Sequence, residues 1–183
     1  MSDTEANQPT ATKHRPIKPF TFRESVELFE SGVMEIKDTP DTIFAAATDD
    51  SMTFGMDTHV LFADAEAGTD GMSLAHAWLA PHYDLPPHSH NGDCLYYVVE
   101  GSIQLGKREL KKGDGFFVPK DSTYRYVAGE NGAEVIEFRT AVAFDFRYRD
   151  TDPERWTDRF QTAATHREEW KQARADFHKR VSS

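Results

Sequence analysis

The sequence predicts an all-β protein, a barrel or double-sheet jelly roll, with a short helix on each side of it. Many short segments rich in β-branched and aromatic residues follow Gly32. Turn-forming pairs such as Asp-Gly and Asn-Gly separate them, and no long helix interrupts the series. Such a series is typical of sandwiches and barrels and argues against a parallel α/β sheet. The expected strands are Val33–Lys37, Thr42–Ala47, His59–Ala63, Met72–Ala80, Cys94–Glu100, Ser102–Leu105, Gly115–Val118, Thr123–Ala128, Ala133–Arg139 and Val142–Phe146.

The segment before the barrel has two parts. Residues 1–19 are polar and contain three prolines, so we expect a disordered tail. Residues 20–32 predict a short helix: Thr21 and Glu24 fit a capping box, and Phe22, Val26 and Phe29 fall on one helical face.

The barrel is expected over 33–148, and a helical extension over 149–183. Asp152 and Pro153 form a cap and a first helical turn. Downstream, an apolar stripe that includes Trp170 and Phe177 needs a surface to cover it, either the barrel or a second subunit.

Charge and cysteine content limit the partners and the compartment. The net charge is −10, and no Lys or Arg occurs between Lys37 and Lys107. This acidic field argues against nucleic acid and anionic membranes as partners. The single cysteine, Cys94, has no internal disulfide partner, and the polar start of the chain lacks a secretory signal. We therefore expect a cytoplasmic protein.

The histidine pair His88-Ser89-His90 carries the clearest chemical signal. Residues two apart on an extended chain point to the same face, so both imidazoles could reach one metal ion. Pro86 and Pro87, just before the pair, favour an extended backbone.

The surroundings of this pair resemble the cupin superfamily over roughly residues 71–146. The first family motif, with its His-x-His and closing Gly, matches His88, His90 and Gly101. The second motif matches Gly113 and Pro119. The resemblance implies a cupin-type double-stranded β-helix or jelly-roll barrel that commonly holds a metal ion.

Two ligand positions of the family pattern hold other residue types here. The family's Glu falls on Cys94 and its third ligand His on Tyr124. If both replace the usual ligands, the metal ligands are His88, His90, Cys94 and Tyr124. A thiolate favours zinc or copper, and a phenolate favours ferric iron.

Two alternatives remain open. Asp93 could supply a carboxylate beside the two histidines, as in two-His-one-carboxylate iron sites, if residue 93 lies in the turn and faces inward. Otherwise the barrel holds no metal, and the two histidines are polar groups of a ligand pocket.

These residues predict a metal-dependent enzyme that acts on a small organic molecule, with iron, zinc or copper as the divalent ion. Dioxygenase-type oxygen chemistry is the first hypothesis among the reactions that the resemblance implies. Tyr96 and Tyr124 are the candidate catalytic residues, and Arg139 could meet an anionic substrate group or pair with Glu137. The alternative is a non-catalytic small-molecule or metal-binding protein. We expect a homodimer, because cupins commonly pair through their sheets.

Overall fold

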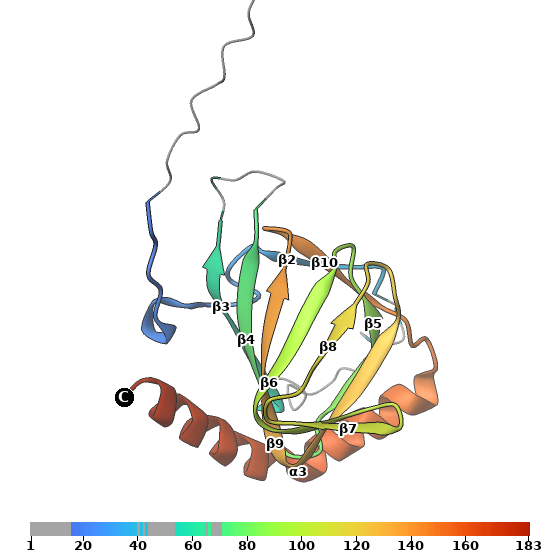
Figure 1. The fold of residues 1–183 in the computed structure, drawn as a ribbon. Helices are drawn as coiled ribbons and strands as arrows, with labels where there is room; N and C mark the ends of the chain where they lie inside the picture. Colours follow the sequence, from blue (N-terminus) through green and yellow to red (C-terminus); the bar gives the residue numbers. More distant parts are fainter. Residues whose placement is uncertain (1–15, 40, 42, 44–53, 65, 67–70) are drawn as a thin grey trace, which may run out of the picture.

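One curled sheet of ten strands forms the body of the protein, and one long helix packs against its outside (Figure 1). This computed structural model describes residues 16–39, 41, 43, 54–64, 66 and 71–183. The strands are β1 (Val26–Glu27), β2 (Met34–Lys37), β3 (Met56–Ala63), β4 (Ser73–Leu79), β5 (Asp84–Ser89), β6 (Cys94–Leu105), β7 (Arg108–Lys111), β8 (Gly115–Val118), β9 (Tyr124–Arg139) and β10 (Phe144–Tyr148).

The strand order is β1-β3-β4-β9-β5-β10-β2, with β6 joining β7, β8 and β9. The β10–β2 pair is parallel, and the other pairs are antiparallel. The long strand β9 connects the two sides, because its first part pairs with β5 and its second part with β4. The all-β barrel fold predicted from the sequence is confirmed.

Two glycines let the paired strands β6 and β9 approach each other closely. Gly101 and Gly132 both have positive φ, 70° and 75°. A Cβ on Gly101 would lie 2.1 Å from the carbonyl oxygen of Gly132. Only glycine allows this combination of a left-handed backbone and close approach. The expected strands on either side of each glycine are therefore joined into one strand each.

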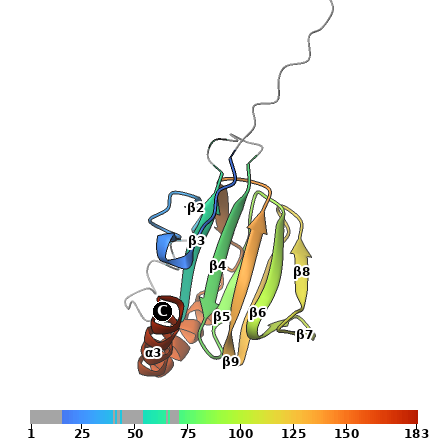
Figure 2. The ribbon, with the colours of Figure 1, turned by 60° about the vertical axis from the view of Figure 1, so that its left-hand side comes forward.

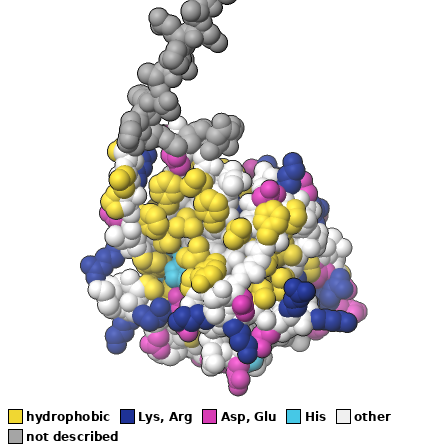
Figure 3. Space-filling view, in the orientation of Figure 1, with side chains coloured by type: hydrophobic (Ala, Val, Ile, Leu, Met, Phe, Trp, Pro, Cys, Tyr) yellow, Lys and Arg dark blue, Asp and Glu magenta, His cyan; other side chains and the backbone are white. Residues whose placement is uncertain are grey.

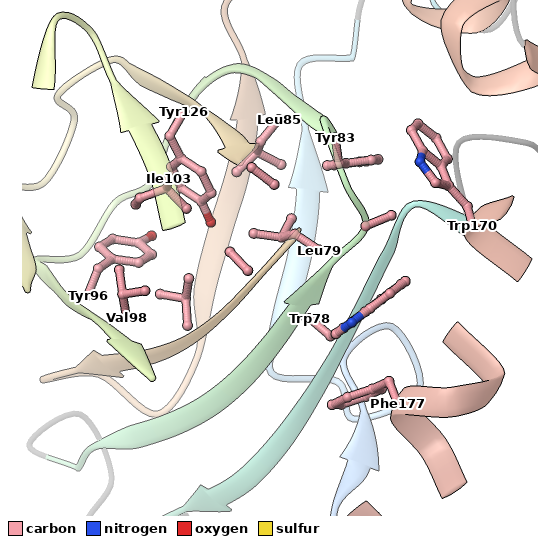
Figure 4. Packing of buried hydrophobic residues seen from close by; sticks show 14 of the residues in the cluster. Trp78, Leu79, Tyr83, Leu85, Tyr96, Val98, Ile103, Tyr126, Trp170 and Phe177 are labelled. Carbon is pink, nitrogen blue, oxygen red and sulfur yellow. The ribbon is translucent and has the colours of Figure 1, made fainter. Parts of the chain in front are cut away.

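Helix α3 (Pro153–Val181) confirms the predicted C-terminal helix. Asp152 caps it by accepting a hydrogen bond from the Glu154 backbone N–H (3.0 Å). Its apolar stripe packs on the barrel of the same chain: Trp170 against Tyr83 and Phe177 against Trp78 (Figure 4). The stripe is thus covered without a second subunit. In the rotated view α3 lies on the opposite side of the sheet from β7 and β8 (Figure 2).

The predicted N-terminal helix is wrong. A 3-10 turn, η1 (Phe22–Glu24), is followed by β1, whose Val26 and Glu27 pair with Val60 and His59 of β3. The segment pairs with the edge of the sheet in place of forming a helix. The three apolar residues that would form one face of the helix are not buried together, so burial does not favour the helix. Of that face, Val26 and Phe29 stay exposed.

Other strand boundaries differ from the expected ones. Strands β5 and β7 were not predicted, since Pro86 and Pro87 in β5 read as a turn and β7 is short and polar. Of the predicted strand Thr42–Ala47 only residue 43 is described, and residues 1–15 of the predicted tail lie outside the described residues. None of the described helices is long and apolar enough to cross a membrane.

Candidate functional site

A cavity of about 420 Å³ opens inside the barrel. This size suits a small organic molecule. Apolar side chains make up most of its wall. Its polar wall residues include His88, His90, Tyr124, Tyr126, Glu137 and Arg139. A smaller cavity of about 240 Å³ lies where α3 meets β5, and the carboxylate of Asp84 in its wall already binds Arg125 and Arg159. The barrel interior is therefore the candidate site.

Strand β5 and the residue after it deliver the two histidines to the cavity. His88 is in register with Tyr124 of β9 and with Tyr148 of β10, so it is held between two neighbouring strands. The side chains of His88 and His90 are both buried, and their rings lie 5.0 Å apart. The predicted inward orientation of both imidazoles agrees with their place in the cavity wall.

Backbone carbonyls fix the tautomer of both imidazoles. Nδ1 of His88 lies 2.8 Å from the Pro86 oxygen, and Nδ1 of His90 lies 2.5 Å from the Asp145 oxygen. A carbonyl can only accept a hydrogen bond, so each Nδ1 carries the proton and each Nε2 keeps a lone pair. Burial lowers the pKa of His88 to about 4 and that of His90 to about 2, and the charge of Arg139 adds to both shifts. Both rings are neutral at pH 7.

The two predicted catalytic tyrosines form a chain with these groups. Arg139 Nη2 donates to the Tyr96 hydroxyl (3.3 Å), and that hydroxyl hydrogen-bonds the hydroxyl of Tyr124. The Tyr124 hydroxyl in turn lies 3.0 Å from the acceptor Nε2 of His90. Burial raises the pKa of both phenols well above 10, so both are protonated. Each hydroxyl therefore accepts one hydrogen bond and donates one, in a single direction from Arg139 to His90.

Cys94 is buried at the start of β6 and is not in the wall of the cavity. Burial raises the pKa of its thiol to about 12, and this effect outweighs the nearby Arg139. The thiol is therefore protonated near neutral pH in the metal-free protein. Ligation of a metal by Cys94 stays a prediction and would require loss of this proton.

Asp93 does not join the histidines. Its side chain is exposed, and its Oδ1 accepts a hydrogen bond from the Lys120 backbone N–H (2.8 Å). The alternation that turns Cys94 inward turns Asp93 outward, so the carboxylate alternative is wrong.

Arg139 places a buried positive charge in the wall of the cavity. Its buried guanidinium donates to Glu137 Oε2 (2.7 Å) and lies 3.8 Å from the centre of the Phe144 ring. Within the described part of the chain, its Nε and Nη1 have no hydrogen-bond partner. Sequence reasoning noted Arg139 but did not select Glu137 as a site residue. Their spacing of two along β9, which puts both on one face, was the available signal.

Compact groups of metal-binding side chains are rare in this protein. Within the described ranges, Asp57, His59 and His178 form the one group of three His, Cys, Asp or Glu side chains whose ligand atoms all lie within 4.8 Å of one another. The histidine pair and Cys94 do not form such a group. Of the four predicted metal ligands, His88, His90 and Tyr124 line the cavity, and the carboxylates of Glu27 and Glu137 also lie in its wall.

No protein-family model matches the sequence, and a search of curated proteins finds no relative. Solved structures do resemble the barrel. The polyketide cyclase RemF from Streptomyces resistomycificus aligns with a TM-score of 0.47 and 24% identity, over 57% of this chain and 79% of its own. KdgF from Halomonas sp. aligns with a TM-score of 0.41 and 25% identity, over 47% and 79%.

An RmlC-like cupin from Shewanella frigidimarina aligns with a TM-score of 0.41 and 22% identity, over 49% of this chain and 78% of its own. Each of these likenesses covers only part of the chain. The chemistry of the barrel therefore has to be argued from its own residues.

The resemblance stated from the sequence implies a metal ion, and the histidine pair in this barrel has the chemistry to bind one. Metal-binding histidines usually donate their second ring N–H to a carbonyl or carboxylate, as both Nδ1 atoms do here. Ligand imidazoles must be neutral at working pH, and burial keeps these neutral. The positive charge of Arg139 would oppose a cation, but the Glu137 carboxylate pairs with it at 2.7 Å.

Proposed function

We propose that this cupin is a metal-dependent enzyme that acts on a small organic anion inside the barrel. His88 and His90 would hold a divalent ion, iron, zinc or copper, and Tyr124 would be the third donor from the cavity wall. The observation that carries the proposal is the tautomer of the histidine pair: both Nδ1 atoms are held by backbone carbonyls, which leaves both Nε2 atoms as acceptors. The Tyr124 hydroxyl, which donates to His90 Nε2 in the metal-free protein, would give up that hydrogen bond when the ion binds. Oxygen chemistry of the dioxygenase type is the first reaction class that we assign.

A divalent ion bound there would polarise a substrate oxygen or, in the case of iron or copper, exchange electrons. The residues of the chain have the remaining tasks. The hydroxyls of Tyr96 and Tyr124 hold protons next to the His90 imidazole and would deliver one to a substrate atom in the cavity. Arg139 would bind the anionic group of the substrate, because two of its nitrogens lack a partner among the described residues.

Apolar residues around the polar cluster would receive the body of the substrate. They include Ile36, Phe144, Phe146, Trp156 and Phe160. This lining excludes water and strengthens every charge interaction within the cavity. The substrate class that fits is a small molecule with one anionic group on an apolar body.

Elemental analysis of untagged protein tests the proposal. We expect a transition metal in the wild type, and loss of the metal of the barrel together with activity in the His88→Ala/His90→Ala variant. The matched control is His166→Ala, which removes a histidine on α3 that pairs with Glu169 (2.9 Å). If the double variant keeps the full metal content of the wild type, the assignment of the site is wrong.

A non-catalytic binder is the second candidate, and Arg139 favours it. A buried guanidinium with unpaired nitrogens could hold an organic anion without any metal, while the thiol and phenols stay protonated. Calorimetry on metal-stripped protein separates the two functions. Binding of small aromatic carboxylates at full strength without metal supports the binder, whereas binding that requires the metal supports the enzyme.

A further inference from the structure

A second cluster of metal-binding side chains lies outside the barrel, where the end of α3 meets β3. Asp57 and His59 come from β3, and His178 comes from the last turn of α3. His59 Nε2 lies 3.1 Å from Asp57 Oδ1, and His178 Nε2 lies 2.5 Å from Asp57 Oδ2. Neither histidine is in the wall of the barrel cavity.

Strand alternation explains why these residues face the helix. Thr58 lines the barrel cavity, so its neighbours Asp57 and His59 point to the opposite face of β3. Helix α3 is held over that face by Phe177, whose ring stacks on Trp78 with 5.6 Å between centroids (Figure 4). The next residue, His178, is thereby placed beside Asp57.

The carboxylate of Asp57 is fully buried, with 0% of its side chain exposed. Its Oδ2 binds Arg174 Nε (2.9 Å), which keeps the group ionised and oriented. Its Oδ1 and the facing His59 Nε2 both lack a hydrogen bond of acceptable geometry to any described residue. A buried, ionised oxygen that faces an imidazole at 3.1 Å without a hydrogen bond is costly, and a cation between these two atoms would satisfy both.

The other ring nitrogen of His59 is already engaged. Its Nδ1 lies 3.0 Å from the hydroxyl of Ser25, which can accept the ring proton and leave Nε2 with its lone pair. This is the arrangement in which an outer partner fixes the tautomer of a metal-binding histidine. The ring also packs on Phe22, with 4.8 Å between centroids, so its orientation is fixed.

We propose that Asp57, His59 and His178 bind a divalent transition-metal ion that ties the end of α3 to β3. Two imidazole nitrogens and one carboxylate oxygen favour zinc. In a tetrahedral zinc site with bonds of about 2.0–2.1 Å, donor atoms lie roughly 3.3 Å apart. The 3.1 Å between His59 and Asp57 is close to this spacing. His178 is 41% exposed, so water can occupy the fourth position.

The zinc site does not depend on the function proposed for the barrel, and a titration separates the two. Untagged, metal-stripped protein is titrated with zinc by calorimetry and with cobalt(II) in the visible range. We expect His178→Gln to weaken zinc binding at this site at least tenfold and to remove its cobalt band. His178 is partly exposed, so this variant should fold; Asp57→Asn is the second variant.

His166→Gln is the matched control, since it removes a histidine of the same helix that also pairs with a carboxylate. It should bind zinc as the wild type does, and the His88→Ala/His90→Ala variant should keep the site on α3. Zinc should also raise the thermal unfolding midpoint of the wild type and of His166→Gln more than that of His178→Gln. Unchanged zinc and cobalt binding in both His178→Gln and Asp57→Asn would overturn the proposal, as would equal losses in His178→Gln and His166→Gln.

Discussion

At the scale of single residues, His88 and His90 show how burial sets chemistry. An exposed histidine is partly protonated near neutral pH, and a protonated ring cannot bind a metal. Here each ring is buried, donates from Nδ1 to a carbonyl and stays neutral. The spacing of the two residues could be read from the sequence. The carbonyl partner of His90 could not, because Asp145 lies on β10, distant in the chain.

The same burial makes the metal-free protein sensitive to acid. The pKa values of His88 and His90 fall from 6.5 in the unfolded chain to about 4 and about 2 in the fold. Between about pH 4 and pH 6.5 the unfolded chain therefore binds more protons, so the free energy of unfolding decreases as the pH falls. From pH 7 to pH 5 we expect a loss of about 2 kcal/mol for each histidine.

Urea unfolding of metal-stripped protein at pH 7 and pH 5 measures the decrease in the free energy of unfolding. A His88→Gln/His90→Gln variant should lack most of this decrease. The carboxylates with lowered pKa, such as Asp57 and Glu134, titrate mainly below this window and stay unchanged in the variant. An equal loss in both proteins would show that the histidines are not buried as described.

Cys94 and Tyr124 mark the limit of sequence reasoning at the residue scale. Cys94 is buried outside the cavity wall, whereas Tyr124 lines the cavity and contacts His90. Whether a thiol or phenol is ionised depends on desolvation by the surrounding fold. The raised pKa values of both groups follow from packing that no local pattern encodes.

At the scale of elements, the close pairing of β6 with β9 depends on Gly101. Gly101→Ala would place a methyl group 2.1 Å from the Gly132 oxygen in a backbone conformation that alanine rarely adopts. We expect it to destabilise the fold by about 1–2 kcal/mol from the backbone and about 1–3 kcal/mol more from the clash. Chemical denaturation measures the difference.

Gly106→Ala is the control for the Gly101→Ala variant. Gly106 also has positive φ (59°), but a Cβ there would meet nothing within 4 Å. It should cost only the backbone part, about 1–2 kcal/mol. Equal decreases in the free energy of unfolding in Gly101→Ala and Gly106→Ala would show that β6 and β9 do not approach each other as closely as described.

Elements were predictable where local pattern and tertiary contacts agree. Helix α3 has a cap, a proline and an apolar stripe that the barrel covers, and its limits were close to those expected. The N-terminal helix failed because β1 gains sheet pairing with β3. Strand β5 was missed because Pro86 and Pro87 resemble a turn, although their register in the sheet shifts between Leu85 and His88 to accommodate them.

At the scale of the whole molecule, an apolar surface lies on the outer face of the sheet (Figure 3). Leu95 and Tyr97 of β6 and Phe117 of β8 are 52%, 48% and 56% exposed. Leu95 is in register with Phe117, so the side chains are neighbours across two strands. Such a surface is typical of an interface, and the predicted homodimer would use it.

Sedimentation at tens of micromolar tests the dimer. We expect the wild type to sediment as a dimer. The Leu95→Lys/Phe117→Lys variant should sediment as a folded monomer, because two charged side chains disfavour burial of this surface in an interface. The control is a lysine at Val26, an exposed apolar residue of β1 outside the cavity wall. A monomeric wild type, or a double variant that remains dimeric, would contradict this use of the surface.

The central claim is that His88 and His90 hold a metal ion inside the barrel. Anomalous diffraction from a crystal of untagged protein, recorded at the absorption edges of iron, copper and zinc, tests it most directly. We expect an anomalous peak inside the cavity at a bonding distance of about 2.0–2.2 Å from the Nε2 atoms of both histidines. A barrel without such a peak after loading with all three metals, or an imidazole of this pair turned to solvent, would contradict it.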